Sequence, residues 1–212
     1  MATDYNEETF ARDFDVSRET LERFRIYAAK LEKWNQAINL VSRDTLGDLW
    51  RRHFLDSAQL LHCLPRAVRP DTCWVDLGSG AGFPGLVLAL MSAGEFHLVD
   101  SDARKCTFLR EVSRETGTPV HIHNQRIDSL SLPTADYVTA RACAPLPRLV
   151  DYARPLLRPG GYCLFLKGAR LDEELTLLRK AGKMPLDISG AEVFPSESDS
   201  KGRILRLGPY SS

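Results

Sequence analysis

The sequence predicts an α/β fold in which helices cover both faces of a mostly parallel sheet. From residue 73 onward, apolar strand-like runs alternate with helical patterns, as expected for consecutive β-α-β units. The first of these units carries a glycine-rich turn, Asp76 to Gly82, between an apolar strand and a helix. The 212 residues suffice for one full domain with a buried core.

The N-terminal region is expected to be a helical extension, residues 1–70, joined to a main domain of residues 71–212. Apolar residues between Leu21 and Ile38 recur on one helical face, and Ser17 is suited to cap that helix. A second helical pattern runs from Leu46 to Leu61.

The elements of the main domain can be assigned in order. We expect strands at 73–75, 95–100, 120–122, 137–140 and 162–166, weaker strands near 188–194 and 203–207, helices at 86–91, 103–116 and 171–181, a turn at 158–161 and an exposed loop at 196–202. Gly117 is expected to cap the helix that ends at Thr116. These strands together predict a seven-stranded sheet.

The glycine-rich turn is the candidate cofactor site. Gly78, Gly80 and Gly82 permit positive φ and a close approach of the backbone to a ligand. The next strand ends in Asp100, where a carboxylate can bind ribose hydroxyls of either NAD or S-adenosylmethionine. Asp76, suited to the ammonium group of a methionine, and the short chain favour S-adenosylmethionine. An NAD-binding oxidoreductase remains the alternative enzyme class.

Composition restricts the partners and the location of the protein. Lys+Arg and Asp+Glu both total 28, so a nucleic acid would have to bind a local basic patch. The five cysteines are scattered without C-x-x-C spacing, which argues against disulfides and against a metal site. The N-terminus has no signal-like apolar segment, and no apolar run has membrane-spanning length. We therefore expect a cytosolic protein without a membrane or metal partner.

Several motifs together resemble one enzyme family. They are Trp34-Asn35-x-x-Ile38-Asn39-Leu40, His53-Phe54-Leu55-Asp56-Ser57, the glycine turn followed by Phe83-Pro84-Gly85, Arg141-Ala142, and Leu166-Lys167-Gly168. Between residues 20 and 170 the chain thereby resembles the bacterial small-subunit ribosomal RNA guanine-N7 methyltransferases, the glucose-inhibited division protein B family. The last forty residues resemble that family only weakly.

The resemblance implies a Rossmann-like class I fold, S-adenosyl-L-methionine as cofactor, and methylation of N7 of one guanine in the decoding-region hairpin of 16S rRNA. It also implies that Gly78, Phe83, Ile127, Asp128 and Arg141 line the cofactor pocket. Asp128 stands where the family often has a glutamate, so its reach to the adenine is shorter. Together with the residues of the glycine turn, the expected cofactor site is Asp76, Gly78, Gly80, Gly82, Phe83, Asp100, Ile127, Asp128 and Arg141.

The expected chemistry needs positioning more than acid–base catalysis. Guanine N7 has a free in-plane lone pair, so the transfer removes no proton, and positioning can supply roughly 7–11 kcal/mol of the barrier at best. The Asn-Pro-Pro-Tyr type of tetrapeptide used for exocyclic amines does not follow the fourth strand. Arg141 and Lys167 end strands at the ligand-binding edge of the sheet and are the catalytic candidates.

Cys143 could suggest cytosine-C5 methylation, which uses a thiolate nucleophile. The surrounding sequence lacks the Pro-Cys or Thr-Cys pair, and a free cysteine is commonly a small apolar core residue. We therefore favour a packing role for Cys143.

The candidate RNA contacts are Arg51, Arg52 and His53. Asp44 and Asp48 interrupt this basic strip, so an ordinary charged helix face is the alternative. A structural hydrogen bond is the alternative role of His53. The partner would be 16S rRNA or the small ribosomal subunit. A methyltransferase for another RNA, a protein or a small molecule, and a non-catalytic ribosome-assembly factor, remain alternative functions.

Overall fold

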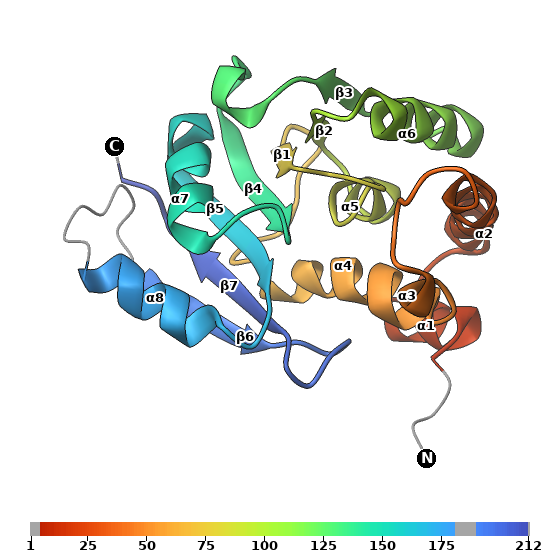
Figure 1. The fold of residues 1–212 in the computed structure, drawn as a ribbon, viewed down its shortest axis with the longest axis horizontal. Helices are drawn as coiled ribbons and strands as arrows, with labels where there is room; N and C mark the ends of the chain where they lie inside the picture. Colours follow the sequence, from red (N-terminus) through yellow and green to blue (C-terminus); the bar gives the residue numbers. More distant parts are fainter. Residues whose placement is uncertain (1–4, 181–189, 212) are drawn as a thin grey trace.

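A seven-stranded sheet forms the centre of the computed structural model, which describes residues 5–180 and 190–211 (Figure 1). The strands are β1 (Cys73–Leu77), β2 (Glu95–Asp100), β3 (His121–Asn124), β4 (Ala135–Arg141), β5 (Leu157–Lys167), β6 (Glu192–Pro195) and β7 (Arg203–Leu207). Their order is β3-β2-β1-β4-β5-β7-β6. The first five run parallel, whereas β7 is antiparallel to β5 and β6 to β7. The predicted α/β fold is confirmed.

Helices cover both faces of the sheet, with α7 and α8 on one side and α5, α6 and the N-terminal helices on the other (Figure 1). The helices are α1 (Glu7–Asp13), α2 (Arg18–Asn35), α3 (Arg43–Leu46), α4 (Asp56–Ala58), α5 (Gly85–Met91), α6 (Ala103–Thr116), α7 (Leu146–Ala153) and α8 (Leu171–Lys180). Shorter turns of other helix types are η1 (Trp50–Leu55), η2 (Gln59–Cys63), η3 (Ile127–Ser129) and η4 (Arg154–Leu156). Within the described residues, no helix combines the length and the apolar character needed to cross a membrane.

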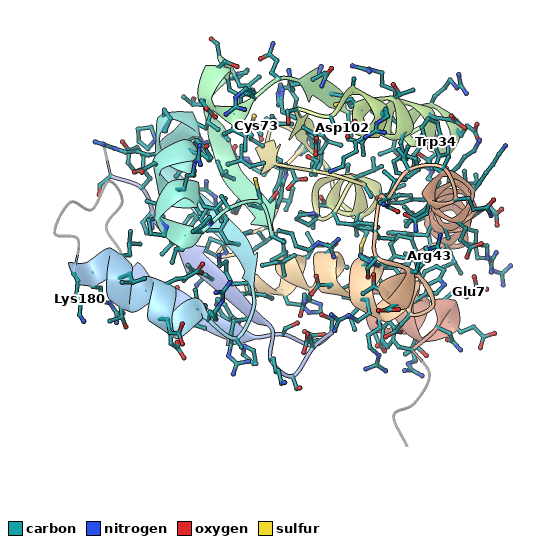
Figure 2. The ribbon with its side chains drawn as sticks, in the orientation of Figure 1. Glu7, Trp34, Arg43, Cys73, Asp102 and Lys180 are labelled. Atoms are coloured by element: carbon teal, nitrogen blue, oxygen red, sulfur yellow. The ribbon has the colours of Figure 1, made fainter. Side chains whose placement is uncertain are left out.

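The N-terminal helices share their core with the main domain. Phe54 lies 4.9 Å from Phe24 and 6.0 Å from Phe83 between ring centroids, which links η1 to α2 and to the glycine turn. Trp34 of α2 points toward α6, where its ring lies 5.7 Å from that of Phe108 (Figure 2). This packing holds the N-terminal segment beside the carboxyl ends of β1 and β2.

Two predicted boundaries agree closely with the structure. Ser17 caps α2 by accepting a hydrogen bond from the Thr20 backbone N–H at 3.1 Å. Helix α6 has the predicted bounds, and Gly117 follows it with a positive φ of 62°. Both ends depend on local capping chemistry, which a sequence shows directly.

The stretch predicted as helical from Leu46 to Leu61 is helical from Trp50 onward, but it is not a single α-helix. The segment is divided into η1, a π-helical turn, then α4 and the 3₁₀ turn η2. Ser57 contributes a local irregularity because its buried hydroxyl donates to the carbonyl of His53 at 2.7 Å. π-Helical turns occur frequently at functional sites, and this one carries His53.

The turn predicted at 158–161 and the exposed loop predicted at 196–202 also need correction. Residues 158–161 belong to β5, because Gly160 N–H and Gly161 C=O pair with the backbone of Tyr210, both at 2.8 Å. In the loop, Ser198 is only 6% exposed because it hydrogen-bonds to residues of the N-terminal helices. Of the strand predicted near 188–194, β6 accounts for the end, and residues 188–189 lie outside the described part.

Candidate functional site

A cavity of about 600 Å³ lies at the carboxyl edge of the sheet, next to the glycine-rich turn. We call it the glycine-turn cavity. Its lining includes Leu40, Gly78, Ser79, Gly80, Ala81, Phe83, Val99, Asp100, Ser101, Lys105, Gln125, Arg126, Ile127, Asp128, Arg141, Ala142, Cys143, Ala144, Arg148 and Tyr152. This position matches the rule that open parallel sheets bind ligands at their carboxyl ends.

The three glycines of the turn have different roles. Gly80, at φ 57°, lines the cavity, and an added Cβ would meet no atom closer than 3.8 Å. Gly78, at φ 67°, also lines it, but an added Cβ would lie 2.5 Å from Sγ of Cys143. Gly82 is not among the lining residues, and its added Cβ would lie 2.5 Å from Oη of Tyr27. Gly80 therefore leaves open space for a ligand, whereas Gly82 permits helix packing.

The two acidic residues of the motif also differ. Asp100 lies on the cavity wall, where one carboxylate oxygen accepts from Gly80 N–H at 2.9 Å and the other from Asp102 N–H at 2.8 Å. Asp76 does not line the cavity and is 1% exposed. It accepts hydrogen bonds from Thr139 Oγ1 at 2.7 Å and from Gly85 N–H at 3.1 Å. Burial raises the pKa of Asp76. The geometry gives Asp76 a structural role and departs from the predicted ligand contact.

Ile127 and Asp128 lie in η3 on the far wall of the same cavity. Arg126 donates a hydrogen bond to Asp128 at 3.0 Å and thereby lowers the pKa of that carboxyl. The Asp128 carboxylate is thus charged and oriented by its neighbour. The lining by Gly78, Phe83, Ile127, Asp128 and Arg141 agrees with the positions that the motifs implied.

A second cavity, of about 460 Å³, adjoins the first. Its lining includes Leu40, Val41, Ser42, Thr45, Arg52, His53, Asp56, Arg141, Ala142, Leu166, Lys167, Gly168, Ser196, Ser198, Asp199, Gly202 and Arg203. Leu40, Arg141 and Ala142 line both cavities. Ala142 has a φ of 50°, which is strained for a residue with a Cβ. Such strain is concentrated at functional sites, and here it lies between the two cavities.

Arg141 is held in a fixed position at this junction. Its Nη1 donates to the Arg52 carbonyl and to the Asp56 carboxylate, both at 3.2 Å. Its Nη2 lies 3.0 Å from Nδ1 of His53. An arginine has five N–H donors. These contacts leave donors of Arg141 for a ligand in either cavity.

His53 is buried beside Arg141. It is 5% exposed, and burial together with Arg141 and Arg52 lowers the pKa of His53 to about 3. Because Nδ1 faces the Arg141 donor, the ring proton belongs on Nε2, which lies 2.9 Å from the Thr45 hydroxyl. A neutral, buried imidazole orients Arg141 and is poorly suited to the phosphate contact that the sequence suggested.

The other basic candidates are distributed unevenly. Lys167 lines the second cavity, but its ammonium is paired with Glu174 at 2.7 Å and 10% exposed. Arg52 lines the same cavity and pairs with Asp199 at 3.0 Å. Arg51 lines neither cavity and lies over the ring of Tyr5, 5.6 Å from its centroid. Only Arg52 and Lys167 of this set therefore face the second cavity.

Sequence reasoning missed Ser198 and Asp199 as residues of the second cavity. They belong to the segment after β6, where the motifs give no guidance. The polar spacing of residues 196–202 indicated a loop, and only the sheet order brings that loop beside Asp56. Long-range contact of this kind has no local signal in one sequence.

Three histidines, His97, His121 and His123, lie together on β2 and β3. His97 Nδ1 is 3.0 Å from His123 Nε2, and the ring planes of His97 and His121 differ by 18°. Nearly parallel, stacked rings cannot aim their in-plane lone pairs at one ion. In residues 5–180 and 190–211, no group of three or more His, Cys, Asp or Glu is arranged to hold a metal ion.

The sequence of the chain is similar to known methyltransferases that act on ribosomal RNA. Residues 20–189 match the family model of rRNA small subunit methyltransferase G. The chain is 53% identical to the ribosomal RNA small subunit methyltransferase G of Rhodospirillum centenum, over 93% of this chain and 88% of the relative. It is 54% identical to the protein of the same name from Paramagnetospirillum magneticum, over 92% of each chain.

A solved structure supports the fold. A candidate class I S-adenosylmethionine-dependent methyltransferase from Listeria monocytogenes superposes with a TM-score of 0.61 at 13% identity, covering 89% of this chain and 68% of that one. The predicted family and fold are thus both confirmed. The chain belongs to the rRNA small subunit methyltransferase G family.

Proposed function

We propose that the protein transfers a methyl group from S-adenosyl-L-methionine to N7 of a guanine in the decoding-region hairpin of 16S rRNA. The observation that carries this proposal is the junction of two cavities at Arg141 and Ala142, in a chain of this family. One cavity has the glycine turn and acidic strand end of a nucleoside-type cofactor site. The other presents polar and basic groups to a second ligand.

The residues of the glycine-turn cavity fit the cofactor. Gly80 leaves open the space that a Cβ would occupy, and Asp100 presents a carboxylate at the end of β2. Asp100 would bind the ribose hydroxyls, and the wall of Ile127 and Asp128 would hold the adenine. When bound, the cofactor supplies an electrophilic methyl group on a sulfonium.

The chain itself contributes orientation of the nucleophile. N7 of guanine attacks through a lone pair, so a general base is unnecessary, and positioning carries the rate enhancement. Arg141 has N–H donors directed by three protein contacts, and guanine presents O6 and N7 as acceptors on one edge. We assign Arg141 to donate to O6, which holds that edge beside the first cavity while the N7 lone pair stays free to attack the methyl group.

The second cavity suits one guanosine of an RNA chain. Arg52, Arg141, Lys167 and Arg203 line it against two carboxylates, Asp56 and Asp199. Because Glu174 also pairs with Lys167, four cations face three carboxylates, and this small local excess attracts phosphates although the whole chain has no net charge. Reading a base in a pocket requires that the nucleotide leave its stack. We therefore place the target guanosine in this cavity, with Lys167 and Arg52 toward its phosphates.

Three further expectations belong to the same proposal. The substrate would be the small ribosomal subunit or its 16S rRNA, and the protein would work in the cytoplasm. Residues 1–70 would form an extension, preceding the main domain 71–212 in sequence, that shapes the second cavity. The shared aromatic core of η1, α2 and the glycine turn supports that arrangement.

Labelled S-adenosylmethionine and 16S rRNA from a strain lacking the enzyme test the function. Nucleoside analysis should find the label in 7-methylguanosine. Arg141→Ala should abolish turnover at saturating cofactor, while the protein still binds S-adenosylhomocysteine. Label in 5-methylcytosine would refute the assignment of the base, and tight NADH binding without S-adenosylhomocysteine binding would refute the cofactor.

A further inference from the structure

The loop between β6 and β7, residues 196–202, lies outside the part of the chain that matches the family model, which ends at residue 189. In the structure it crosses to the N-terminal helices. The loop residues Ser196, Ser198, Asp199 and Gly202, followed by Arg203 of β7, line the second cavity. The loop therefore forms one wall of that cavity.

Hydrogen bonds connect this loop to Arg141. The Ser198 hydroxyl donates to one oxygen of the Asp56 carboxylate at 2.5 Å. The other oxygen of Asp56 accepts from Arg141 Nη1 at 3.2 Å. Ser198 is 6% exposed, so water competes little for the first of these bonds. Gln59 Nε2 donates to the first oxygen as well, at 3.1 Å, so Ser198 and Gln59 together fix the direction in which Asp56 presents its second oxygen to Arg141.

Gln59 anchors the same loop. Its side chain is 1% exposed, and its Nε2 donates to the Ser196 hydroxyl at 3.1 Å. Its Oε1 accepts from the Glu197 backbone N–H at 2.6 Å. Arg52 and Asp199 add an ion pair at 3.0 Å across the cavity rim. A buried, mutually satisfied polar network of this kind holds one arrangement of its members.

We propose that the β6–β7 loop is part of the substrate site, and that Ser198 is a positioning residue that acts on the target guanosine through Asp56 and Arg141. The inference rests on the proposed function. Arg141 can direct its remaining N–H donors into the cavity only while its other donors are held by the Arg52 carbonyl, Asp56 and His53. Loss of the Ser198 hydroxyl leaves that oxygen of Asp56 with the longer Gln59 hydrogen bond, at 3.1 Å, and thereby loosens the carboxylate that orients Arg141.

Ser198→Ala tests this role, with Ser200→Ala as the matched control. Ser200 belongs to the same loop but is exposed and is not among the residues that line the cavity. Ser198→Ala should lower kcat with 16S rRNA at least tenfold, with a smaller change in KM and with unchanged affinity for S-adenosylhomocysteine. Ser198→Thr, which keeps the hydroxyl, should restore most of kcat. Ser200→Ala should behave as the wild type.

A double-mutant comparison shows whether Ser198 acts through Arg141. The affinity of the S-adenosylhomocysteine-loaded protein for 16S rRNA should fall on Ser198→Ala, and this loss should disappear when Arg141 is already alanine. An undiminished loss in the Arg141→Ala background would overturn the pathway. So would a Ser198→Ala enzyme with wild-type kcat while the wild type forms 7-methylguanosine. If the wild type forms none, the proposed function itself fails.

Discussion

The guanidinium of Arg141 lies over the ring of Phe83, with Cζ 4.8 Å from the ring centroid. Phe83 follows the glycine turn, and Arg141 ends β4, so this contact joins the two cavities through a cation and an aromatic face. Such a contact contributes about 0.5–2 kcal/mol, more where water is excluded. Phe83 is itself stacked on His53, with ring centroids 4.8 Å apart. The orientation of Arg141 is thus determined by packing as well as by hydrogen bonds.

Asp100→Asn tests the ribose contact. The substitution keeps the shape of the side chain but removes the charge that strengthens hydrogen bonds to hydroxyls. It also replaces one of the two oxygens that accept from Gly80 N–H and Asp102 N–H by an NH2 group. Calorimetry should show S-adenosylhomocysteine binding weakened about tenfold, or roughly 1.5 kcal/mol. Asp71→Asn is the control, because Asp71 is exposed and lies before β1 at the opposite end of that strand. Equal affinity of the Asp100 variant and wild type would remove Asp100 from the cofactor site.

Alanine at Gly80 and at Gly82 should have opposite consequences. An added Cβ at Gly80 meets open cavity space, so Gly80→Ala should lower the free energy of unfolding only by the roughly 1–2 kcal/mol that a positive φ costs a residue with a Cβ. The same Cβ would occupy ligand space, so S-adenosylhomocysteine binding should weaken strongly. At Gly82 the Cβ would lie 2.5 Å from Tyr27 Oη, so Gly82→Ala should lower the melting temperature far more. Thermal unfolding without ligand and calorimetry distinguish the two. A Gly82→Ala protein as stable as Gly80→Ala would contradict the packing argument.

Local chemistry determined which parts of the fold could be predicted. Helix α6 has the predicted bounds because Gly117, the C-cap that the sequence indicated, ends it, and in the structure the Asp102 side chain caps its start. The segment from Leu46 to Leu61 was predicted as one helical stretch because its apolar spacing fits that period, yet the structure divides it into π, α and 3₁₀ turns. Periodicity cannot reveal a π-helical turn that depends on packing against Phe83 and Arg141.

The lining of the glycine-turn cavity was predictable from the residues themselves only where a motif marks it. Gly80 and Asp100 were found because a glycine turn and an acidic strand end are recognisable in sequence. Asp76 and Gly82 belong to the same motif but serve packing, and spacing alone cannot separate the two roles. Ser198 contacts Asp56 across 142 positions in sequence, which only the sheet topology brings together.

Cys143→Ser should retain most activity and the same product. Cys143 lies in the glycine-turn cavity, but burial raises the pKa of its thiol, which leaves little thiolate at neutral pH. A small change in rate follows from the close packing of its Sγ against Gly78. Nucleoside analysis of RNA treated with the variant checks the product. A folded variant without activity would indicate a covalent role for the thiol.

Arg52→Ala and Arg51→Ala should differ in their effect on RNA binding. Arg52 lines the second cavity, so its loss should reduce the slope of log affinity against log salt by roughly 0.7–0.9. Arg51 lines neither cavity and should change that slope little. Titrations of S-adenosylhomocysteine-loaded protein with 16S rRNA between low and moderate salt provide the slopes. A larger change of slope for Arg51→Ala than for Arg52→Ala would place the RNA along the outer face of η1.

His53 should make the protein sensitive to acid. Its pKa of about 3 in the folded state lies below the ordinary value of 6.5, so the unfolded chain binds the proton first as the pH falls. The stabilising contribution of neutral His53 is therefore complete above pH 6.5 and is lost progressively from there toward pH 3. The free energy of unfolding that His53 contributes changes by at most about 1.4 kcal/mol per pH unit.

His53→Gln removes this titration but keeps a polar side chain. The variant should be less stable than the wild type at pH 7.5, because it loses the ring contacts with Phe83 and Arg141. Between pH 6.5 and 5 its free energy of unfolding should fall less steeply than that of the wild type, so the two curves converge. Urea unfolding at several pH values measures both slopes, and the comparison cancels the other histidines. Parallel curves would mean that His53 is protonated in the folded protein, and its role as the neutral acceptor for Arg141 would have to be abandoned.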